Sequence, residues 1–444
     1  MVGKSKIENP KSKFASGVRH RVVLITTLAS LVLYLDRYCL SELLKYKPVV
    51  ADLGLNEDQT SWSLSAFFWS YALLQVPAGW LADRFGPRRL YFFYIVGWSL
   101  FAAATGLADG FAMLFLIRLA LGIMQAGAYP ASGSLLSRWV PLAERGWASA
   151  MIGFGGRIGA AAATAFTTRM IIVSGDWRWI MLLYGGLGAV VAAAYWWIVR
   201  DWPAEHPAVN AAERALIAGD RPLEAEPHSA ASNQFDDSLA AFKYLLTSGS
   251  MWWMCLAQVT TNFGWVFLVT LLPSYLVQGR GFSDQLGANM NAVVLVAGMA
   301  GMLLGGRITD AVSRRLGVRW GRALPIALSR FVAAAAYVAV IYLAPPWAVV
   351  AAFCLVAIAT DLGVPATWAF AQDVGGKYAG AVLGWGNMWG NFGSAAAPVV
   401  VDLLGHRGDQ PMDWNAGLVA CAAAFFISGI AAFGIDATKP VMVR

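Results

Sequence analysis

A polar sequence that occurs twice, each time after a long apolar run, constrains the fold of this chain more than any other feature. The first copy, residues 79–89, reads GWLADRFGPRR, and the second, residues 306–315, reads GRITDAVSRR. Their aspartates, Asp83 and Asp310, are separated by about half the length of the chain. Self-similarity at this period predicts two similar halves, each built from the same arrangement of apolar segments.

The apolar segments are long enough to cross a lipid bilayer. Hydrophobic residues make up 58% of the 444 residues and charged residues only 13%, whereas a soluble domain carries roughly 25% charge. A helix needs about 20 residues to cross about 30 Å of hydrocarbon. We therefore predict an all-α membrane protein with twelve transmembrane helices in two pseudo-symmetric six-helix halves. The predicted spans are residues 21–43, 60–82, 89–108, 111–139, 147–173, 178–199, 249–277, 286–309, 323–343, 346–372, 378–404 and 413–435.

The longest polar connection separates the two halves. It is rich in Ala, Pro, Glu and Asp and pairs no nucleophile with a base, so we expect a tether rather than a catalytic insert. A short surface helix is expected at Glu213–Ile217, followed by a mobile stretch from Arg221 to Ser238. The predicted parts are a cytoplasmic N-terminal segment (1–20), a first six-helix half (21–200), a cytoplasmic linker (201–247), a second half (248–436) and a cytoplasmic tail (437–444).

The net charge of +7 reflects membrane topology rather than nucleic-acid binding. Lys and Arg are concentrated in alternate connections and are sparse in the connections between them. By the positive-inside rule both termini are cytoplasmic, which requires an even number of spans. We expect a multi-pass monomer in the plasma (inner) membrane, surrounded by lipid and without a nucleic-acid partner. Four cysteines each fall alone within a span, which favours buried apolar roles over disulfides, metal ligands or a cofactor site: Cys39, Cys255, Cys354 and Cys421.

Charged side chains inside the predicted spans are the first candidates for function, because each costs at least about 2.5–3.5 kcal/mol at the centre of a membrane. Span one holds Asp36 and Arg37. The alternative to a functional role for them is a structural ion pair with another span. Span four places Arg118 and Gln125 on one helical face, two turns apart. Span five places Arg157 among glycines, where it has a functional role or links two helices.

Two membrane halves that enclose a polar site are typical of secondary transporters, which expose the site to each side of the membrane in turn. Trp368, in mid-span beside polar residues, either lines this site or packs against its neighbours. A receptor that binds the same ligand without moving it is the alternative from another class, and it would need a docking motif for a partner. A membrane enzyme would need a clustered base or metal site, whereas the four histidines are scattered: His20, His206, His228 and His406.

Several short motifs follow one another in a characteristic order. They are YLDR (34–37), YALLQVPAGW (71–80), residues 118–130, DWRW (176–179), RDWP (200–203), DLGVPATW (361–368), GGKYAG (375–380) and NMWGN (387–391). In this order and spacing the chain resembles the major facilitator superfamily, and within it the anion:cation symporter family of sialin, the vesicular glutamate transporters and bacterial sugar-acid permeases. The resemblance covers residues from about 20 to 436.

The resemblance implies that Arg37 would bind the carboxylate of a small organic anion, to which a guanidinium makes a planar two-point contact. The other residues expected to bind substrate are Tyr71, Gln75, Gln125, Arg157, Trp368 and Asn391. Asp36 would take up a co-transported proton, and Arg118 would couple or gate transport. The repeated clusters would latch neighbouring spans at the cytoplasmic side in one state and release them in another; the gating residues are Asp83, Arg84, Arg88, Asp310 and Arg314.

Two positions depart from the pattern of the family that this chain resembles. Proton-driven members carry a glutamate in span four within Gly-x-x-Glu-Ala, whereas this chain has Gln125, which does not titrate. Arg157 adds a positive charge where relatives are small and uncharged. We therefore expect an anion transporter, for a sugar acid or another carboxylate, in which coupling to a proton or sodium ion is weakened in favour of facilitated or exchange transport.

Overall fold

The computed structural model describes residues 15–218, 242–405 and 412–439, and all regular elements in these ranges are helices. The mobile stretch predicted from Arg221 to Ser238 lies outside them. The first half comprises α1 (Val18–Leu43), α2 (Lys47–Asp52), α3 (Glu57–Phe85), α4 (Pro87–Thr105), α5 (Phe111–Ala126), α6 (Ala128–Trp139), η1 (Leu142–Glu144), α7 (Arg145–Ser174) and α8 (Arg178–Ile198). Two short helices follow: η2 (Pro203–Glu205) and α9 (Ala211–Ala218).

The second half is less regular in its first and second helices. The helix from Gly249 contains two π-helical turns on either side of Pro273, and α13 contains a break at Gly317, whose φ of 80° suits glycine. Its elements are α11 (Gly249–Val266), η3 (Phe267–Leu271), α12 (Leu272–Ser274), η4 (Tyr275–Gly279), α13 (Asp284–Tyr342), α14 (Pro346–Gly375), η5 (Gly376–Tyr378), α15 (Ala379–Gly405) and α16 (Trp414–Phe433).

These helices confirm the predicted fold class. Within the described ranges, seven helical stretches are long and apolar enough to cross a membrane. Two of them, residues 285–342 and 346–405, have the length for two crossings each. The more polar α3, α4 and α7 complete the set of twelve predicted spans.

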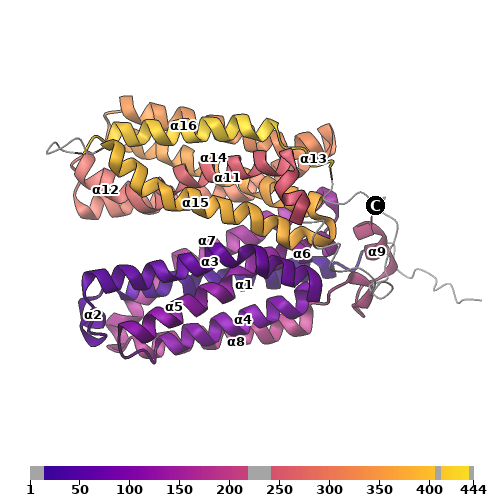
Figure 1. The fold of residues 1–444 in the computed structure, drawn as a ribbon, viewed down its shortest axis with the longest axis horizontal. Helices are drawn as coiled ribbons and strands as arrows, with labels where there is room; N and C mark the ends of the chain where they lie inside the picture. Colours follow the sequence, from indigo (N-terminus) through magenta and orange to yellow (C-terminus); the bar gives the residue numbers. More distant parts are fainter. Residues whose placement is uncertain (1–14, 219–241, 406–411, 440–444) are drawn as a thin grey trace, which may run out of the picture.

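The two halves lie side by side with their helices roughly along the long axis of the molecule (Figure 1). Helices of the first half, indigo to magenta, form the lower bundle, and those of the second half, orange to yellow, form the upper one. The end at which α9 lies is called here the linker end, and α2 lies at the opposite, or far, end.

The apolar cores differ between these ends. One core is shared by both halves and includes Ala82, Leu136 and Ile152 together with Phe370 and Leu383. Two further cores each belong to one half: the first contains Leu40, Leu53 and Trp177, and the second contains Phe267, Tyr275 and Phe353. The halves are thus joined by a continuous apolar core toward the linker end and have separate cores toward the far end.

The short linker helix predicted at Glu213–Ile217 is present as α9 and is docked on the start of α1. The Glu213 carboxylate accepts hydrogen bonds from the backbone N–H groups of Val18 (3.1 Å) and Arg19 (3.0 Å) and from the Ser16 hydroxyl. Burial acts to raise the pKa of Glu213, but these hydrogen bonds and the charge of Arg19 outweigh it and lower the pKa below its usual value. The linker therefore supplies the cap for the first helix.

Candidate functional site

Arg37 lies at the centre of a buried aromatic cage. Its Nε donates a hydrogen bond to Gln125 Oε1 at 3.1 Å, which ties span one to span four. The guanidinium carbon lies 4.4 Å from the ring centroid of Tyr71, 4.7 Å from that of Tyr34 and 5.0 Å from that of Phe67. These electron-rich ring faces stabilise the cation.

Several polar atoms around Arg37 are buried without a hydrogen-bond partner in the described part of the chain. They are Nη2 of Arg37 and both amide atoms of Gln75. Gln75 belongs to α3 and lies against α15: a Cβ added to Gly384 would come within 2.5 Å of the Gln75 backbone oxygen. A buried polar atom without a partner costs about 1–3 kcal/mol, and these atoms are chemically suited to bind a polar ligand or water.

Trp368 and Tyr129 meet across this boundary. Their ring centroids are 4.7 Å apart, and the Tyr129 hydroxyl lies 3.2 Å from Ser30 Oγ. Trp368 thus lies beside the Arg37 cage, since Tyr129 also packs on Tyr34. Asn391, half-buried on α15, donates its amide to the backbone oxygen of Asn387 at 2.8 Å.

Arg157 makes a direct ionic contact between the halves. Its Nη2 lies 2.6 Å from Asp361 Oδ1 on α14, and its guanidinium carbon lies 5.0 Å from the Trp265 ring centroid. The helix-to-helix link, which the sequence left open beside a functional role, is therefore present. The Asp361 carboxylate fits against α13 because Gly298 has no side chain there; a Cβ at this position would lie 2.8 Å from Asp361 Oδ2.

Asp36 and Arg118 are buried close to the site, with side-chain atoms that lack hydrogen bonds. Asp36 is 3% exposed and neither carboxylate oxygen has a partner among the described residues. Arg118 is 1% exposed, its Nε and Nη1 lack partners there, and its guanidinium carbon lies 4.9 Å from the Phe67 ring centroid. The structural ion pair considered for Asp36 is not formed within the described ranges.

The two repeated aspartates occupy equivalent positions at the linker end. Asp83, at the end of α3, accepts hydrogen bonds from the backbone N–H groups of Gly380 (3.0 Å) and Ala381 (2.8 Å) at the start of α15. Asp310, on α13, accepts them from Gly146 (2.9 Å) and Trp147 (2.8 Å) at the start of α7. Each aspartate therefore caps a helix of the other half, where the N–H groups and the helix dipole favour a negative charge.

The basic residues of the two repeats are placed differently. Arg314 reaches the other half, with Nη1 3.4 Å from the backbone oxygen of Ala143. Arg88 donates to the Trp196 backbone oxygen at 2.8 Å, inside the first half. Arg84 packs on the neighbouring rings of its own helix, 5.1 Å from that of Trp80. Of the expected arginine gates, Arg314 is thus positioned between the halves.

A buried ionic triad at the linker end was not predicted. Asp373 Oδ1 lies 2.7 Å from Arg145 Nη1, and Asp373 Oδ2 lies 2.7 Å from Arg322 Nε. All three side chains are at most 2% exposed. Arg322 also donates to the backbone oxygen of Leu142 at 3.3 Å. The sequence shows charges at the ends of three different spans, but it does not show that they meet.

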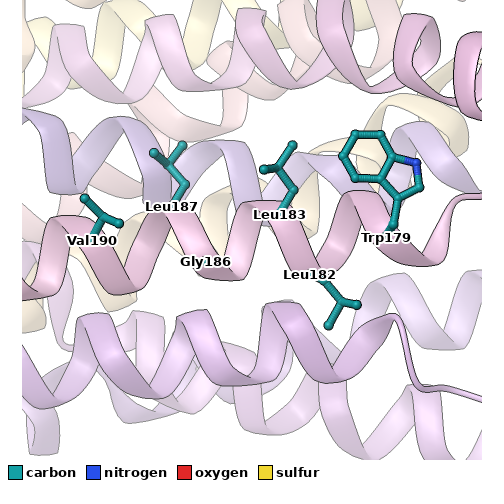
Figure 2. Close-up of a pocket in the computed structure, with 6 residues that line it drawn as sticks. All are labelled: Trp179, Leu182, Leu183, Gly186, Leu187 and Val190. Carbon is teal, nitrogen blue, oxygen red and sulfur yellow. The ribbon is translucent and has the colours of Figure 1, made fainter.

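An apolar hollow lies on α8, away from these polar groups. Figure 2 shows it lined by residues along a single helix, with no charged side chain among them. Its side chains are substantially exposed; Val190, for example, is 66% exposed. Such a surface suits lipid chains rather than an anion. The lining residues are Trp179, Leu182, Leu183, Gly186, Leu187 and Val190.

Comparisons with known proteins agree with this architecture. The profile of the Major Facilitator Superfamily matches residues 26–398. The probable galactarate/D-glucarate transporter GudP of Escherichia coli (strain K12) is 28% identical over 88% of this chain and 87% of its own length. The probable sulfoacetate transporter SauU of Cupriavidus necator is 28% identical over 88% of each chain.

Solved structures give the same fold. A crystal structure of the transporter FucP in the outward conformation has a TM-score of 0.67 at 14% identity, covering 94% of this chain and 98% of that one. The proton:xylose symporter XylE has a TM-score of 0.63 at 14% identity, covering 94% of both chains. Because the family profile spans most of the chain and the two-bundle architecture agrees with it, this protein belongs to the Major Facilitator Superfamily of membrane transporters.

Proposed function

We propose that this protein is a secondary transporter of a small organic anion, a sugar acid or another carboxylate, and that Arg37 binds its acidic group. The observation that carries the proposal is the buried Arg37 guanidinium, whose Nη2 has no partner in the described part of the chain. The Gln75 amide, equally without a partner there, lies one turn along α3 from Tyr71, whose ring packs on Arg37. A guanidinium pairs with a carboxylate through two parallel hydrogen bonds, and an amide suits a hydroxyl of the same ligand. Relatives named as transporters of galactarate, D-glucarate and sulfoacetate support an anion.

Transport would proceed by alternating access of two halves, residues 21–200 and 248–436. We assign the linker end to the cytoplasm, with both termini, because Lys and Arg are concentrated in the connections on that side. The Asp83 and Asp310 caps and the shared core then hold the cytoplasmic side closed, and the bundle in this state faces outward. Release of these caps would let the halves rock and expose the site to the cytoplasm.

Coupling of anion transport to a second ion would depend on Asp36. Arg118 would assist, since it packs on the Phe67 ring, as Arg37 does. Gln125 is neutral and already holds Arg37 by a hydrogen bond, so it supplies no proton. Asp36 is the buried carboxylate near the cage that has no hydrogen bond among the described residues, and protonation would remove the cost of its charge. We propose weakly coupled or exchange transport by a monomer of the inner membrane, with a proton favoured over sodium as any co-transported ion.

Purified protein reconstituted in proteoliposomes tests the anion function. D-glucarate binding, measured by titration calorimetry, is expected to weaken at least about tenfold in both Arg37→Ala and Arg37→Lys, since the lysine ammonium does not reproduce a two-point contact. Arg169→Ala, at an exposed arginine of α7, is the matched control. Wild-type affinity for every sugar acid in Arg37→Ala would contradict the assignment, and binding without uptake or counterflow would favour the receptor.

The same vesicles with an imposed pH gradient test the coupling. The wild type is expected to exchange the anion readily but to concentrate it weakly, and Gln125→Glu is expected to increase concentrative uptake. Strong proton-driven uptake by the wild type that Asp36→Asn leaves unchanged would overturn this part of the proposal.

A further inference from the structure

We propose that Arg157 is a second anion subsite, in which Asp361 occupies the place of a substrate's second acidic group, so that the protein selects dianions over monoanions. This inference rests on the anion function proposed above and specifies its substrate class.

The contact with Asp361 shows that the Arg157 guanidinium accepts a carboxylate at a distance of 2.6 Å. The Arg157 side chain is 20% exposed, whereas that of Asp361 is 5% exposed. Part of the Arg157 side chain is therefore accessible, while its internal partner is enclosed. A carboxylate that arrives from the accessible side meets a guanidinium already oriented by Asp361 and by the Trp265 ring.

Arg157 and Arg37 are close enough to address one ligand because they share the same aromatic wall. Gly156, adjacent to Arg157, packs against Tyr34: a Cβ at this position would lie 3.0 Å from a carbon of that ring. The guanidinium carbon of Arg37 lies 4.7 Å from the centroid of the same ring. Tyr38 interacts electrostatically with both arginines. The Tyr34 ring thus neighbours both the Arg37 guanidinium and the turn of α7 that carries Arg157.

The charges buried between the two ends also favour a dianion. Arg330, the fourth arginine there, donates to Thr261 Oγ1 at 2.9 Å and to the backbone oxygen of Thr360 at 2.7 Å, but to no carboxylate in the described ranges. With all groups ionised, the cations outnumber the anions by two, and uncompensated charge in this environment is costly. The groups counted are Arg37, Arg118, Arg157, Arg330, Asp36 and Asp361.

Asp361 is an internal competitor for Arg157 and keeps a second cationic neighbour when it is displaced. Arg330, on α13, acts on Asp361 electrostatically and donates to the backbone oxygen of the preceding residue, Thr360, at 2.7 Å. Exchange of Asp361 for the substrate therefore replaces one ion pair of Arg157 by another, and the positive charge of Arg330 remains near Asp361. Because Asp361 belongs to the second half and Arg157 to the first, the exchange also removes a bond between the halves.

A matched ligand pair tests the proposal: D-glucarate carries an acidic group at both ends, and D-gluconate carries one at a single end. Affinities are measured by titration calorimetry on the purified full chain. The wild type is expected to bind D-glucarate at least about tenfold more tightly. Arg157→Gln is expected to bring the two affinities within about threefold of each other, mainly by weakening D-glucarate. Asp361→Asn is expected to widen the preference, because the competitor is removed.

Arg169→Gln, at an exposed arginine of α7, is the matched control and is expected to leave the ratio unchanged. A purely structural link between the halves would change both affinities by the same factor in Arg157→Gln and in Asp361→Asn, and that result would overturn the inference. Equal wild-type affinities would overturn it too, while leaving the anion function intact. Failure of the wild type to bind any sugar acid would instead contradict the proposed function itself.

Discussion

The Asp83 and Asp310 caps at the linker end lie in two regions that the repeated sequence makes alike. In each copy a glycine precedes the aspartate by four residues, so both lie on one face of the helix. A Cβ at Gly79 would lie 2.4 Å from the Gly380 backbone oxygen, and one at Gly306 would lie 2.9 Å from that of Gly146. The glycine lets the helices touch, and the aspartate one turn later caps the start of the partner helix.

The difference between the two regions lies in what surrounds each cap. Beside Asp310, the triad adds one buried ion pair between the halves, Arg145–Asp373, which is supported by a second pair inside the second half, Arg322–Asp373. Around Asp83, Arg84 and Arg88 make their contacts inside the first half. The repeated motif therefore encodes the cap alone, and the ionic reinforcement of one side comes from residues outside it.

The largest expected effect comes from breaking this reinforcement with Asp373→Asn. The change leaves two arginines buried against one neutral amide, and removal of one partner from a buried ion pair costs about 3–5 kcal/mol. The closed linker end pays this cost in full, whereas water relieves it when the halves separate there. One spin label is placed at the end of α3 and the other near the break in α13 at Gly317, both at the linker end. The distance between them is expected to lengthen and to report mainly the inward-facing state.

Asp436→Asn is the matched control, since Asp436 follows α16 at the linker end and its carboxylate contacts Lys439 and Thr438 of the second half within the described ranges. Unchanged distances in Asp373→Asn would show that the triad does not hold the halves together.

Asp83→Asn and Asp310→Asn sharpen the comparison at a smaller scale. Each removes one charge from a helix N-terminus but keeps an amide oxygen that accepts a hydrogen bond, so each is expected to weaken closure by about 1 kcal/mol. Because the two caps have the same geometry and lie on opposite halves, the shifts are expected to be equal and to add in the double variant. Ligand binding should persist, since neither residue touches the Arg37 cage. A large difference between the two single variants would break the equivalence inferred from the repeat.

The smallest effect is expected for Glu213→Gln, which tests whether the linker contributes to the closed end. Loss of the charge weakens the bonds to the start of α1 by about 1 kcal/mol. Hydrogen exchange at the Val18 and Arg19 amides is expected to quicken, with the Arg314→Gln variant, which leaves this contact intact, as the control. Unaltered exchange would show that α9 does not depend on this carboxylate.

The same contact has a defined pH dependence. The pKa of Glu213 is lowered in the folded protein, so its stabilisation is fully present above its ordinary value of about 4.3 and is lost as the pH falls through its folded value. Protection of the two amides in the wild type is therefore expected to decline below about pH 4.3, and Glu213→Gln is expected to remove that decline.

The sequence by itself determined the membrane class, the two halves, the twelve spans and the transporter family. Apolar length, Lys and Arg bias and the repeated motif are local properties of the chain, and the bilayer converts them directly into helices with few alternatives. The candidates Arg37, Gln125 and Trp368 were also visible, because polar and aromatic residues stand out within apolar spans.

Only the tertiary structure decided which of these groups meet. That Asp310 caps α7, that Asp373 joins Arg145 to Arg322, and that Arg157 faces Asp361 depend on pairing helices far apart in the chain. No period within a helix specifies such a partner, since packing across the halves is set by small residues, such as glycines, that allow backbones to approach. A charged residue within a span predicts that a partner is present, but only the fold identifies which residue that partner is.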